Sequence, residues 1–276
     1  MSVYHRVSPE ELHQCLESLT AQSRQPSQIV IVIDGPVAAE LSTLLEDFQK
    51  ASPEQVTLVP LAENGGLVAA LNAGMSHCSG DWVLRMDADD IALPQRFELQ
   101  LGLLEAEPNI DVLGSAMLEF DSDPRHPERL KPVLQSHEEI TQNLGLRNPI
   151  NHPTACIRKS HLEKVGGYPE LHLLEDYFLW AKLLNNGATF KNLAEPLYLF
   201  RFDDQTLERR GGASNFSNEV WLRHWMYKEK LINLPVLCLT TALQIVLRFA
   251  PLFVRRFLWR RSRKPYSKSI QLAETI

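Results

Sequence analysis

Gln28-Ile29-Val30-Ile31-Val32-Ile33, with Asp34-Gly35-Pro36 directly after it, is the stretch that decides the fold. A continuous run of β-branched residues is typical of a strand that is buried on both faces, as in a parallel sheet. Glycine and proline interrupt such runs, so the strand is expected to end at Asp34. The pattern predicts an α/β protein whose sheet is covered by helices.

The segments around this strand alternate between helical and extended patterns. On its N-terminal side we expect a helix at 8–19, and on its C-terminal side helices at 41–48, 67–78 and 95–107 and strands at 56–60 and 82–86. This order is that of a doubly wound sheet, in which ligands bind beyond the carboxyl ends of the strands. Asp34 and Asp87 each directly follow a predicted strand, so they are the first candidates for functional side chains.

The second half of the chain repeats the alternation with shorter elements. We expect strands at 111–119, 154–158, 190–193 and 197–202, a loop at 121–133 and a helix at 175–185. An α/β domain over residues 1–205 and a C-terminal helical segment over 206–276 account for the whole chain, whose 276 residues suffice for a sizeable core.

The charge is distributed unevenly. Net charge is −6, yet residues 231–276 contain eight basic residues and a single acid, Glu274, so the remainder is strongly acidic. An acidic body does not suit nucleic-acid binding, which needs a basic face. A basic tail beside an apolar run suits an anionic membrane surface. The four cysteines are widely spaced, which argues against a zinc site or a disulfide framework and fits a reducing compartment.

Asp87-Ala88-Asp89-Asp90 is the sharpest local signal. Mg²⁺ and Mn²⁺ prefer oxygen ligands and are commonly held by one or two carboxylates together with substrate phosphates. A solvated acidic turn or a helix cap explains the same residues, and for an isolated pair of acids we would favour that interpretation. Here the position at the end of a buried strand, facing Asp34, favours a metal site.

Glu175-Asp176 opens a predicted amphipathic helix and is the second acidic candidate. The helix dipole alone favours acids in a first turn. A carboxylate directed into a metal site could instead act as a general base.

Three further side chains are candidates for contact with an acceptor. His152 stands in His152-Pro153-Thr154, and Tyr168 and Trp180 could stack on a sugar. A lone histidine is more often structural than catalytic, and the helical spacing of Trp180 with Leu183 and Leu184 favours core packing for that ring.

Taken together, the motifs resemble a family 2 glycosyltransferase with the GT-A fold, in the subgroup of the amylovoran-type bacterial exopolysaccharide and O-antigen transferases. The matching segments occur in the order of the family and cover about residues 1–202: 1–4, 29–35, 63–67 with 72–74, 85–90 with 94–97, 152–154, 166–168, 175–177 and 197–201. The resemblance implies a GT-A catalytic domain over 1–205, a doubly wound mixed sheet flanked by helices, and transfer of a sugar from a nucleotide-sugar donor.

The resemblance also implies residue roles. Asp176 would be the catalytic base of an inverting displacement, and Asp89 would hold a divalent cation, Mn²⁺ or Mg²⁺, on the donor diphosphate. Glu175 joins the tentative acceptor contacts His152, Tyr168 and Trp180. The donor would contact residues at or near strand ends: Val3, Tyr4, Asp34, Asn64, Asn72 and Asp87. A UDP-sugar is the favoured donor, and a glycan or a lipid-linked sugar is the expected acceptor.

The chain departs from the family pattern in its first strand, which normally has several apolar residues before Ser2-Val3-Tyr4, so we expect a clipped strand or a start further upstream. The Q-x-x-R-W signature of processive synthases is absent, which favours the addition of a single sugar. A sugar nucleotidyltransferase is the nearest alternative, but such enzymes usually carry a glycine-rich basic loop after the first strand, and 5–9 lacks glycine. A non-catalytic carbohydrate-binding protein on the same fold is the third possibility, although the presence of both Asp89 and Asp176 argues against it.

The C-terminal segment is apolar at 231–254 and strongly basic at 255–264. Arg248 and Pro251 disfavour a membrane-spanning helix, which needs about 20 largely uncharged residues. We expect an amphipathic segment on the membrane surface, with Phe253, Phe257 and Trp259 inserted. A helical hairpin packed on the catalytic domain is the alternative. With no secretory signal visible, the expected location is the cytoplasm, at the inner face of the cytoplasmic membrane.

Overall fold

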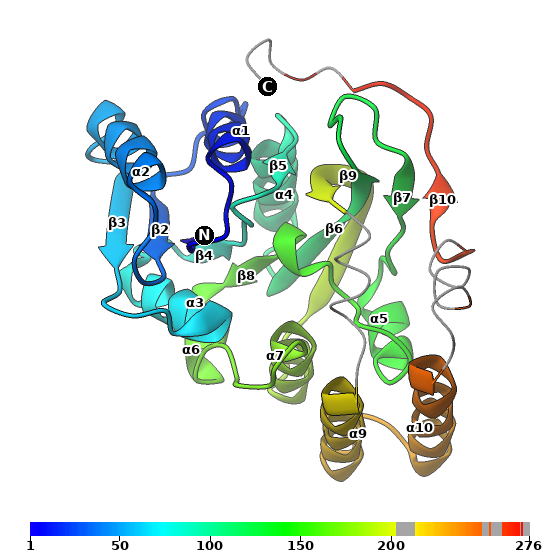
Figure 1. Ribbon diagram of the computed structural model, residues 1–276. Helices are drawn as coiled ribbons and strands as arrows, with labels where there is room; N and C mark the ends of the chain where they lie inside the picture. Colours follow the sequence, from blue (N-terminus) through cyan, green and yellow to red (C-terminus); the bar gives the residue numbers. More distant parts are fainter. Residues whose placement is uncertain (203–212, 250–253, 255–260, 271, 273–276) are drawn as a thin grey trace.

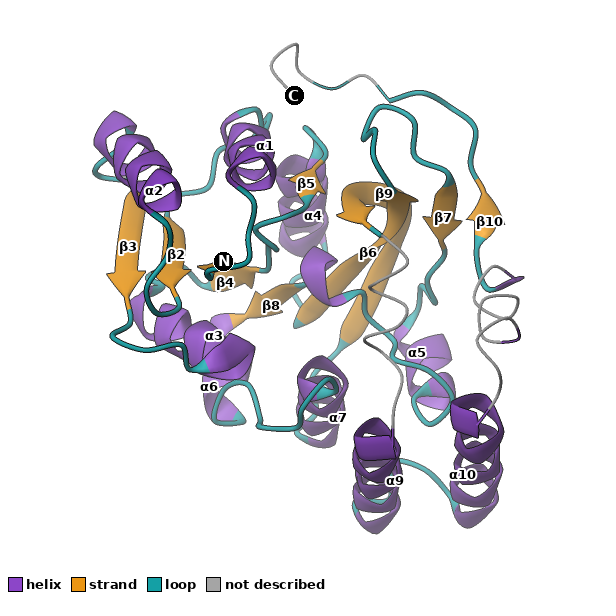
Figure 2. Ribbon diagram, viewed as in Figure 1, coloured by secondary structure: helices purple, strands orange, loops and turns teal. Residues whose placement is uncertain are grey.

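The computed structural model describes residues 1–202, 213–249, 254, 261–270 and 272. The predicted α/β class is confirmed, with strands in the middle of the molecule and helices on both sides (Figure 2). The predicted boundary between 205 and 206 lies outside the described residues, as do Phe253, Phe257 and Trp259.

The N-terminal part is a parallel three-stranded sheet in the order β1-β2-β3. These strands are β1 (Ser2–Val3), β2 (Ile29–Ile33) and β3 (Val56–Pro60). Ile29 and Ile31 face one core with helices α1 (Pro9–Thr20) and α2 (Ala39–Ala51), while Val30 and Val32 face α3 (Gly66–His77). Both faces of β2 are therefore covered, as its unbroken apolar run predicts.

A second, mixed sheet forms the larger part of the molecule. Its path is β10 (Lys264–Pro265), β7 (Arg129–Lys131), β6 (Val112–Phe120), β8 (Cys156–Arg158) and β4 (Trp82–Leu84). The long strand β9 (Phe190–Arg201) runs parallel to β6 and also pairs with β5 (Ile91–Ala92). All nine residues of β6 are buried, so this strand is the centre of the sheet.

A cavity of about 410 Å³ separates the two sheets. Met1 and Val30 line it from the three-stranded side and Trp82 and Leu84 from the other. The α-amino group of Met1 donates to the Val30 carbonyl at 2.9 Å, and burial lowers its pKa to about 6. Within the described chain β1 pairs with β2 alone, so the edges of β1 and β4 do not exchange ladder hydrogen bonds.

The remaining helices cover the second sheet and extend from it. They are α4 (Arg96–Ala106), α5 (His137–Asn143), the short η1 (His152–Thr154), α6 (Lys159–Lys164) and α7 (Glu175–Asn185). Two further helices, α9 (Ala213–Lys228) and α10 (Leu234–Phe249), form a hairpin beyond α7 (Figure 1). The described helices include none that is long and apolar enough to cross a membrane.

The sequence did not indicate β5, α5 or α6, and two of the expected segments differ from the structure. The segment 121–133, expected as a loop, contains β7, because residues 129–131 pair with the buried strand β6. The two strands expected at 190–193 and 197–202 are one strand, whose register with β6 shifts between Ser115 and Ala116. The partner residues at the shift are Leu193 and Pro196; proline, which cannot donate to a ladder, sits at the irregularity.

Candidate active site

The turn at Asp87–Asp90 is fixed by contacts from three other elements. The thiol of Cys15 on α1 donates to the Asp87 carbonyl at 3.3 Å, and the Asp87 amide donates to the hydroxyl of Tyr198 on β9 at 3.1 Å. Arg201, also on β9, donates from its guanidinium to the Asp89 carbonyl at 3.0 Å. The backbone of the turn is therefore held in place before any ligand binds.

The acidic side chains of this turn have different environments. Arg85 is buried and donates to Asp87 Oδ1, while Asp90 is buried and accepts from the Arg201 amide at 2.7 Å. Burial and the charge of Asp89 raise the pKa of Asp90 well above its usual value. Asp89 keeps an exposed side chain, although desolvation by the surrounding protein and then the charge of Asp87 raise its pKa to about 6. Asp89 is thus the most exposed acid of the turn, and Asp87 is partly exposed.

Arg96 supports the end of β4 from the core side. It is fully buried and donates to the Arg85 carbonyl at 2.7 Å and to Gln100 Oε1 at 3.1 Å. Its guanidinium lies 5.0 Å from the centre of the Tyr198 ring, and burial lowers its pKa to about 10. An arginine held by neutral partners here positions the strand end that carries Asp87.

Asp34 accepts hydrogen bonds from the residues at the start of α3. Its carboxylate accepts from the amides of Gly65 at 2.7 Å and Gly66 at 3.1 Å, and its carbonyl accepts from the Asn64 side chain at 3.0 Å. Gly35 has φ of +77° and lies so close to this turn that a Cβ would be 2.5 Å from the Asn64 nitrogen. Asp34 and Asn64 therefore fix the start of α3, and the Asp34 carboxylate is itself the anion that the helix N-terminus favours.

Asn72 links α3 to the turn at Gly166–Tyr168. Its amide donates to the Tyr168 carbonyl at 3.0 Å and accepts from the Tyr168 amide at 2.8 Å. Gly167 has φ of +76°, and a Cβ there would lie 2.4 Å from Asn72 Oδ1, so glycine is required. The Tyr168 hydroxyl lies 3.1 Å from His152 Nε2. Burial and then Arg85 lower the pKa of His152 well below its ordinary value, so this histidine is neutral.

Glu175 and Asp176 begin α7. The carboxylate of Asp176 accepts from the Asn148 side chain at 2.7 Å and from the Tyr177 amide at 2.7 Å. Burial and then the charge of Asp176 raise the pKa of Glu175 to about 7. The two neighbouring acids therefore differ: Asp176 is oriented by donors, whereas Glu175 titrates near neutrality.

The two acidic motifs meet at Tyr168. Burial raises the pKa of its hydroxyl above its usual value; the charge of Arg85 opposes this, while the charges of Asp176, Asp87 and Glu175 add to it. Arg85 and Tyr168 line the same cavity, and the ring of His152, bonded to the Tyr168 hydroxyl, lies 6.1 Å from the ring of Trp180 on α7. The end of β4 and helix α7, distant in sequence, are thus close together in the fold.

Two candidates from the sequence are core residues. Trp180 is fully buried among the side chains of the second sheet and α7, which agrees with its helical spacing and leaves no ring face open to an acceptor. Val3 is also fully buried, and only its carbonyl takes part in the strand-end hydrogen bonds, accepting from the Asp34 amide at 2.8 Å. Burial therefore favours a core role for Trp180 and for the Val3 side chain, while the expected acceptor contact of Trp180 and donor contact of Val3 stay predictions. Tyr4 at the end of β1 is partly exposed.

Asn148, Arg96 and Arg201 are the site residues that sequence reasoning left without a role. Arg96 and Arg201 lie inside segments that match the family, and that match is the signal that could have singled them out. Asn148 stands in a loop without periodicity, so no local pattern indicates it.

The carboxylates of the Asp87–Asp90 turn suit a cation that a bound ligand would also coordinate. In the described part of the chain no group of three or more His, Cys, Asp or Glu side chains is arranged to hold a metal ion. Asp89 is exposed and Asp87 has one oxygen engaged with Arg85, which leaves two carboxylates at one turn. Mg²⁺ and Mn²⁺ are often held by one or two carboxylates with substrate phosphates supplying further ligands, so these residues fit such an ion.

Comparison with known sequences gives one family and several full-length relatives. The model of glycosyl transferase family 2 matches residues 1–166. The amylovoran biosynthesis glycosyltransferase AmsE of Erwinia amylovora is 35% identical over 96% of this chain and 98% of its own length. The UDP-Gal:alpha-D-GlcNAc-diphosphoundecaprenol beta-1,3-galactosyltransferase of Escherichia coli is 31% identical over 95% of this chain and 94% of its own length.

Solved structures share the fold at low identity. S. aureus TarS has a TM-score of 0.64 at 18% identity, over 90% of this chain, which spans only 43% of that longer protein. A shorter form of TarS in complex with UDP has a TM-score of 0.63 at 17% identity, over 94% of this chain and 74% of that one. A mannosyltransferase from Pyrobaculum calidifontis with GDP-Man and Mn²⁺ has a TM-score of 0.55 at 16% identity, over 95% and 78%.

Proposed function

Because the chain belongs to glycosyl transferase family 2 and is a glycosyltransferase with the GT-A fold, we propose that it moves one sugar from a nucleotide-sugar donor to an acceptor hydroxyl with inversion. The observation that carries this proposal is geometric. Arg85, which binds Asp87, lines the same cavity as Tyr168, and His152 joins Tyr168 to α7, the helix that begins with Glu175 and Asp176. One motif offers oxygen ligands for a cation and diphosphate, and the other offers a base, which are the two groups that such a displacement needs.

The donor half of the site is built from strand ends. Asp89 and the free oxygen of Asp87 would hold Mn²⁺ or Mg²⁺, which when bound neutralises charge on the departing diphosphate. Asp34 and Asn64 fix the start of α3 at the carboxyl end of β2, where the donor would lie. Tyr4, which follows β1 and is partly exposed, would border the nucleotide.

The acceptor half centres on Asp176. An ionised carboxylate oriented by Asn148 can take the proton of the attacking hydroxyl, and the hydrogen bonds from Asn148 and the Tyr177 amide favour its ionised form. Glu175 and the neutral His152, bound to the Tyr168 hydroxyl, complete the polar wall on this side.

The names of the relatives suggest the substrates. The Escherichia coli relative is named for a UDP-sugar donor and a diphosphoundecaprenol-linked acceptor, and the Erwinia relative for the synthesis of an exopolysaccharide. By analogy we propose a UDP-sugar donor, a lipid-linked sugar acceptor and action at the inner face of the cytoplasmic membrane.

Donor binding tests the proposal. Titration calorimetry of UDP-sugars should show affinity that depends on Mn²⁺, and Asp89→Ala should remove that dependence while Asp47→Ala, an exposed acid on α2, should leave it unchanged. Equal affinity of Asp89→Ala and the unaltered enzyme in the presence of Mn²⁺ would remove Asp89 from the site. No affinity of the unaltered enzyme for any nucleotide sugar would end the proposal.

A further inference from the structure

The outward face of α10 is apolar from Leu234 to Ile245. Leu234 and Leu239 are 53% and 54% exposed, and Leu243 and Ile245 are each 45% exposed. The other exposed residues of this face are also uncharged: Pro235, Cys238 and Ala242. Positions 235, 238, 239, 242 and 245 recur at three- and four-residue intervals, so they form one stripe on the helix.

The polarity of α10 is inverted relative to an ordinary surface helix. Thr240 is buried, with its hydroxyl donating to the Val236 carbonyl at 2.7 Å, and Thr241 and Gln244 are only partly exposed. A surface helix of a water-soluble protein places polar residues outward. Here the hydroxyl is inside and the leucines are outside, which indicates that the outward face meets an apolar phase.

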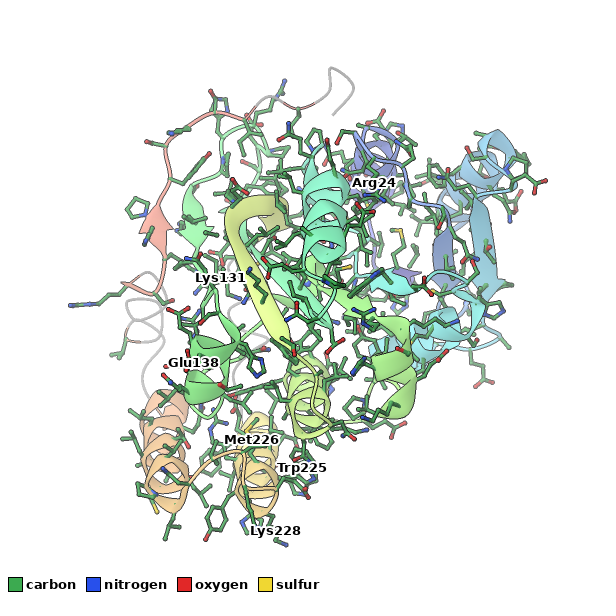
Figure 3. The ribbon with its side chains drawn as sticks, turned by 180° about the vertical axis from the view of Figure 1, so that it is seen from behind. Arg24, Lys131, Glu138, Trp225, Met226 and Lys228 are labelled. Carbon is green, nitrogen blue, oxygen red and sulfur yellow. The ribbon has the colours of Figure 1, made fainter. Side chains whose placement is uncertain are left out.

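Basic and aromatic side chains border this face. Lys228 and Lys230 are exposed at the turn between α9 and α10, and Lys228 stands at the tip of the hairpin, away from the sheets (Figure 3). Trp221 on α9 is 46% exposed. From residue 231 to residue 273 the sequence contains eight basic residues and no acid. An apolar stripe with aromatic and basic neighbours is the composition of interfacial membrane helices.

We propose that the exposed face of α10, formed by Leu234, Pro235, Cys238, Leu239, Ala242, Leu243 and Ile245, docks on an anionic lipid surface and lies in its plane. Helix α10 has 16 residues, about 24 Å at 1.5 Å per residue, which is shorter than a spanning helix of about 20 residues. The face enters the lipid between the headgroups while Lys228 and Lys230 remain among the phosphates.

Charge favours lipid over a second copy of the chain on this face. Lys228 and Lys230 are exposed beside this face, so a symmetric dimer built on α10 would bring like charges close together, which opposes association. An anionic membrane attracts these lysines.

The docking face is joined to the helix that begins with the proposed base. Met226 and Leu222 of α9 pack with Tyr177 and Ala181 of α7 in one buried cluster, and Phe178 of α7 contacts the Trp225 ring at 5.0 Å. Trp225 and Met226 point into the body of the molecule from α9 (Figure 3). If the proposed function holds, docking of α10 sets the distance of α7 and Asp176 from the lipid surface, where a lipid-linked acceptor would be presented.

Vesicle flotation of the full chain tests the docking face directly. We expect the protein to float with phosphatidylcholine vesicles that contain phosphatidylglycerol and to bind pure phosphatidylcholine vesicles far less. Leu239→Glu and Leu243→Glu should each weaken binding roughly tenfold or more, because a carboxylate replaces an inserted leucine. Leu99→Glu, on the exposed side of α4, is the matched control and should bind like the unaltered chain.

Each result has a defined meaning. Equal flotation of Leu239→Glu, Leu243→Glu and Leu99→Glu would overturn the proposal, as would equal binding to neutral and anionic vesicles. A dimer seen by light scattering that Leu239→Glu dissolves, without vesicle binding, would assign the face to a second copy instead. Calorimetry of a UDP-sugar with Mn²⁺, performed on the same variants without vesicles, reports the proposed function separately, and we expect it to be unchanged.

Discussion

The side-chain amide of Asn148 donates a hydrogen bond of 2.7 Å to Oδ2 of Asp176, and the Tyr177 amide donates one of 2.7 Å to Oδ1. One oxygen is thus held from within α7 and the other from a loop 28 residues earlier. Hydrogen bonds of this kind favour the ionised form of a carboxylate and fix its direction. Asn148 is therefore a positioning residue for the proposed base.

Replacement of Asn148 by alanine should lower kcat while leaving the KM for the donor nearly unchanged. Hydrogen bonds to charged groups contribute about 1.5–3 kcal/mol, which corresponds to a loss of about 10- to 100-fold. Steady-state kinetics measures kcat and the donor KM separately. Asn143→Ala, which removes an exposed amide on α5, is the control; an equal effect of the two variants would indicate general destabilisation.

Asp176→Asn should abolish transfer without abolishing donor binding. A general base typically contributes about 10²–10⁴-fold, and the amide cannot accept the proton. Single-turnover transfer and calorimetry with a UDP-sugar separate the two properties, with Asp81→Asn, an exposed acid, as the control. Transfer within a few-fold of the unaltered enzyme would show that another group is the base.

Glu175→Gln should stabilise the folded protein, and the gain should grow with pH. Burial and the charge of Asp176 raise the pKa of Glu175 from 4.5 to about 7, so between these values the folded state binds more protons than the unfolded state. Stability therefore falls as pH rises through this window, and the loss is complete above pH 7. Glutamine does not titrate. The free energy of unfolding of Glu175→Gln should therefore exceed that of the unaltered protein by up to about 3 kcal/mol at pH 8 and by little at pH 4.

Urea unfolding of Glu175→Gln at a series of pH values measures this gain. Glu170→Gln, an exposed neighbour, should give no pH-dependent difference. If Glu175→Gln also gives a constant difference from pH 4 to pH 8, Glu175 is not the titrating group.

The sequence predicted those elements whose side chains have a regular period or an unbroken apolar run. The buried run at 29–33, the capped helix that follows Ser8 and the helix at 175–185 all form as expected, and the GT-A fold is confirmed. Strand β5 has two residues and β7 three; neither is long enough to show a period. They are strands because β9 and β6 pair with them, and such long-range pairing leaves no local trace.

For the site, sequence reasoning identified the acids but could not give their hydrogen-bond partners. Asp34 and Asp87 both follow a strand, so the sequence predicts the same kind of functional role for each. In the structure, the carboxylate of Asp34 accepts from the amides at the start of α3, while that of Asp87 pairs with Arg85. Which donor reaches which acid depends on distances across the fold. The same holds for Asn148, whose partner is 28 residues away.

Arg96→Lys should destabilise the fold by about 2–4 kcal/mol and raise the KM for the donor. Arg96 is fully buried, and its planar guanidinium donates to the Arg85 carbonyl and to Gln100 and packs against the Tyr198 ring. The ammonium group of lysine cannot make these three contacts together. At least one buried acceptor is left unsatisfied, and the end of β4 that carries Asp87 loses its support. Arg24→Lys is the matched control, since Arg24 is exposed on the surface and pairs with Glu105 at 2.6 Å (Figure 3). Exposed pairs contribute about 0–1 kcal/mol, so Arg24→Lys should change neither unfolding nor KM measurably. Equal urea midpoints for the two variants would show that Arg96 does not support the site, because a buried arginine with three neutral partners must cost more to replace than an exposed one.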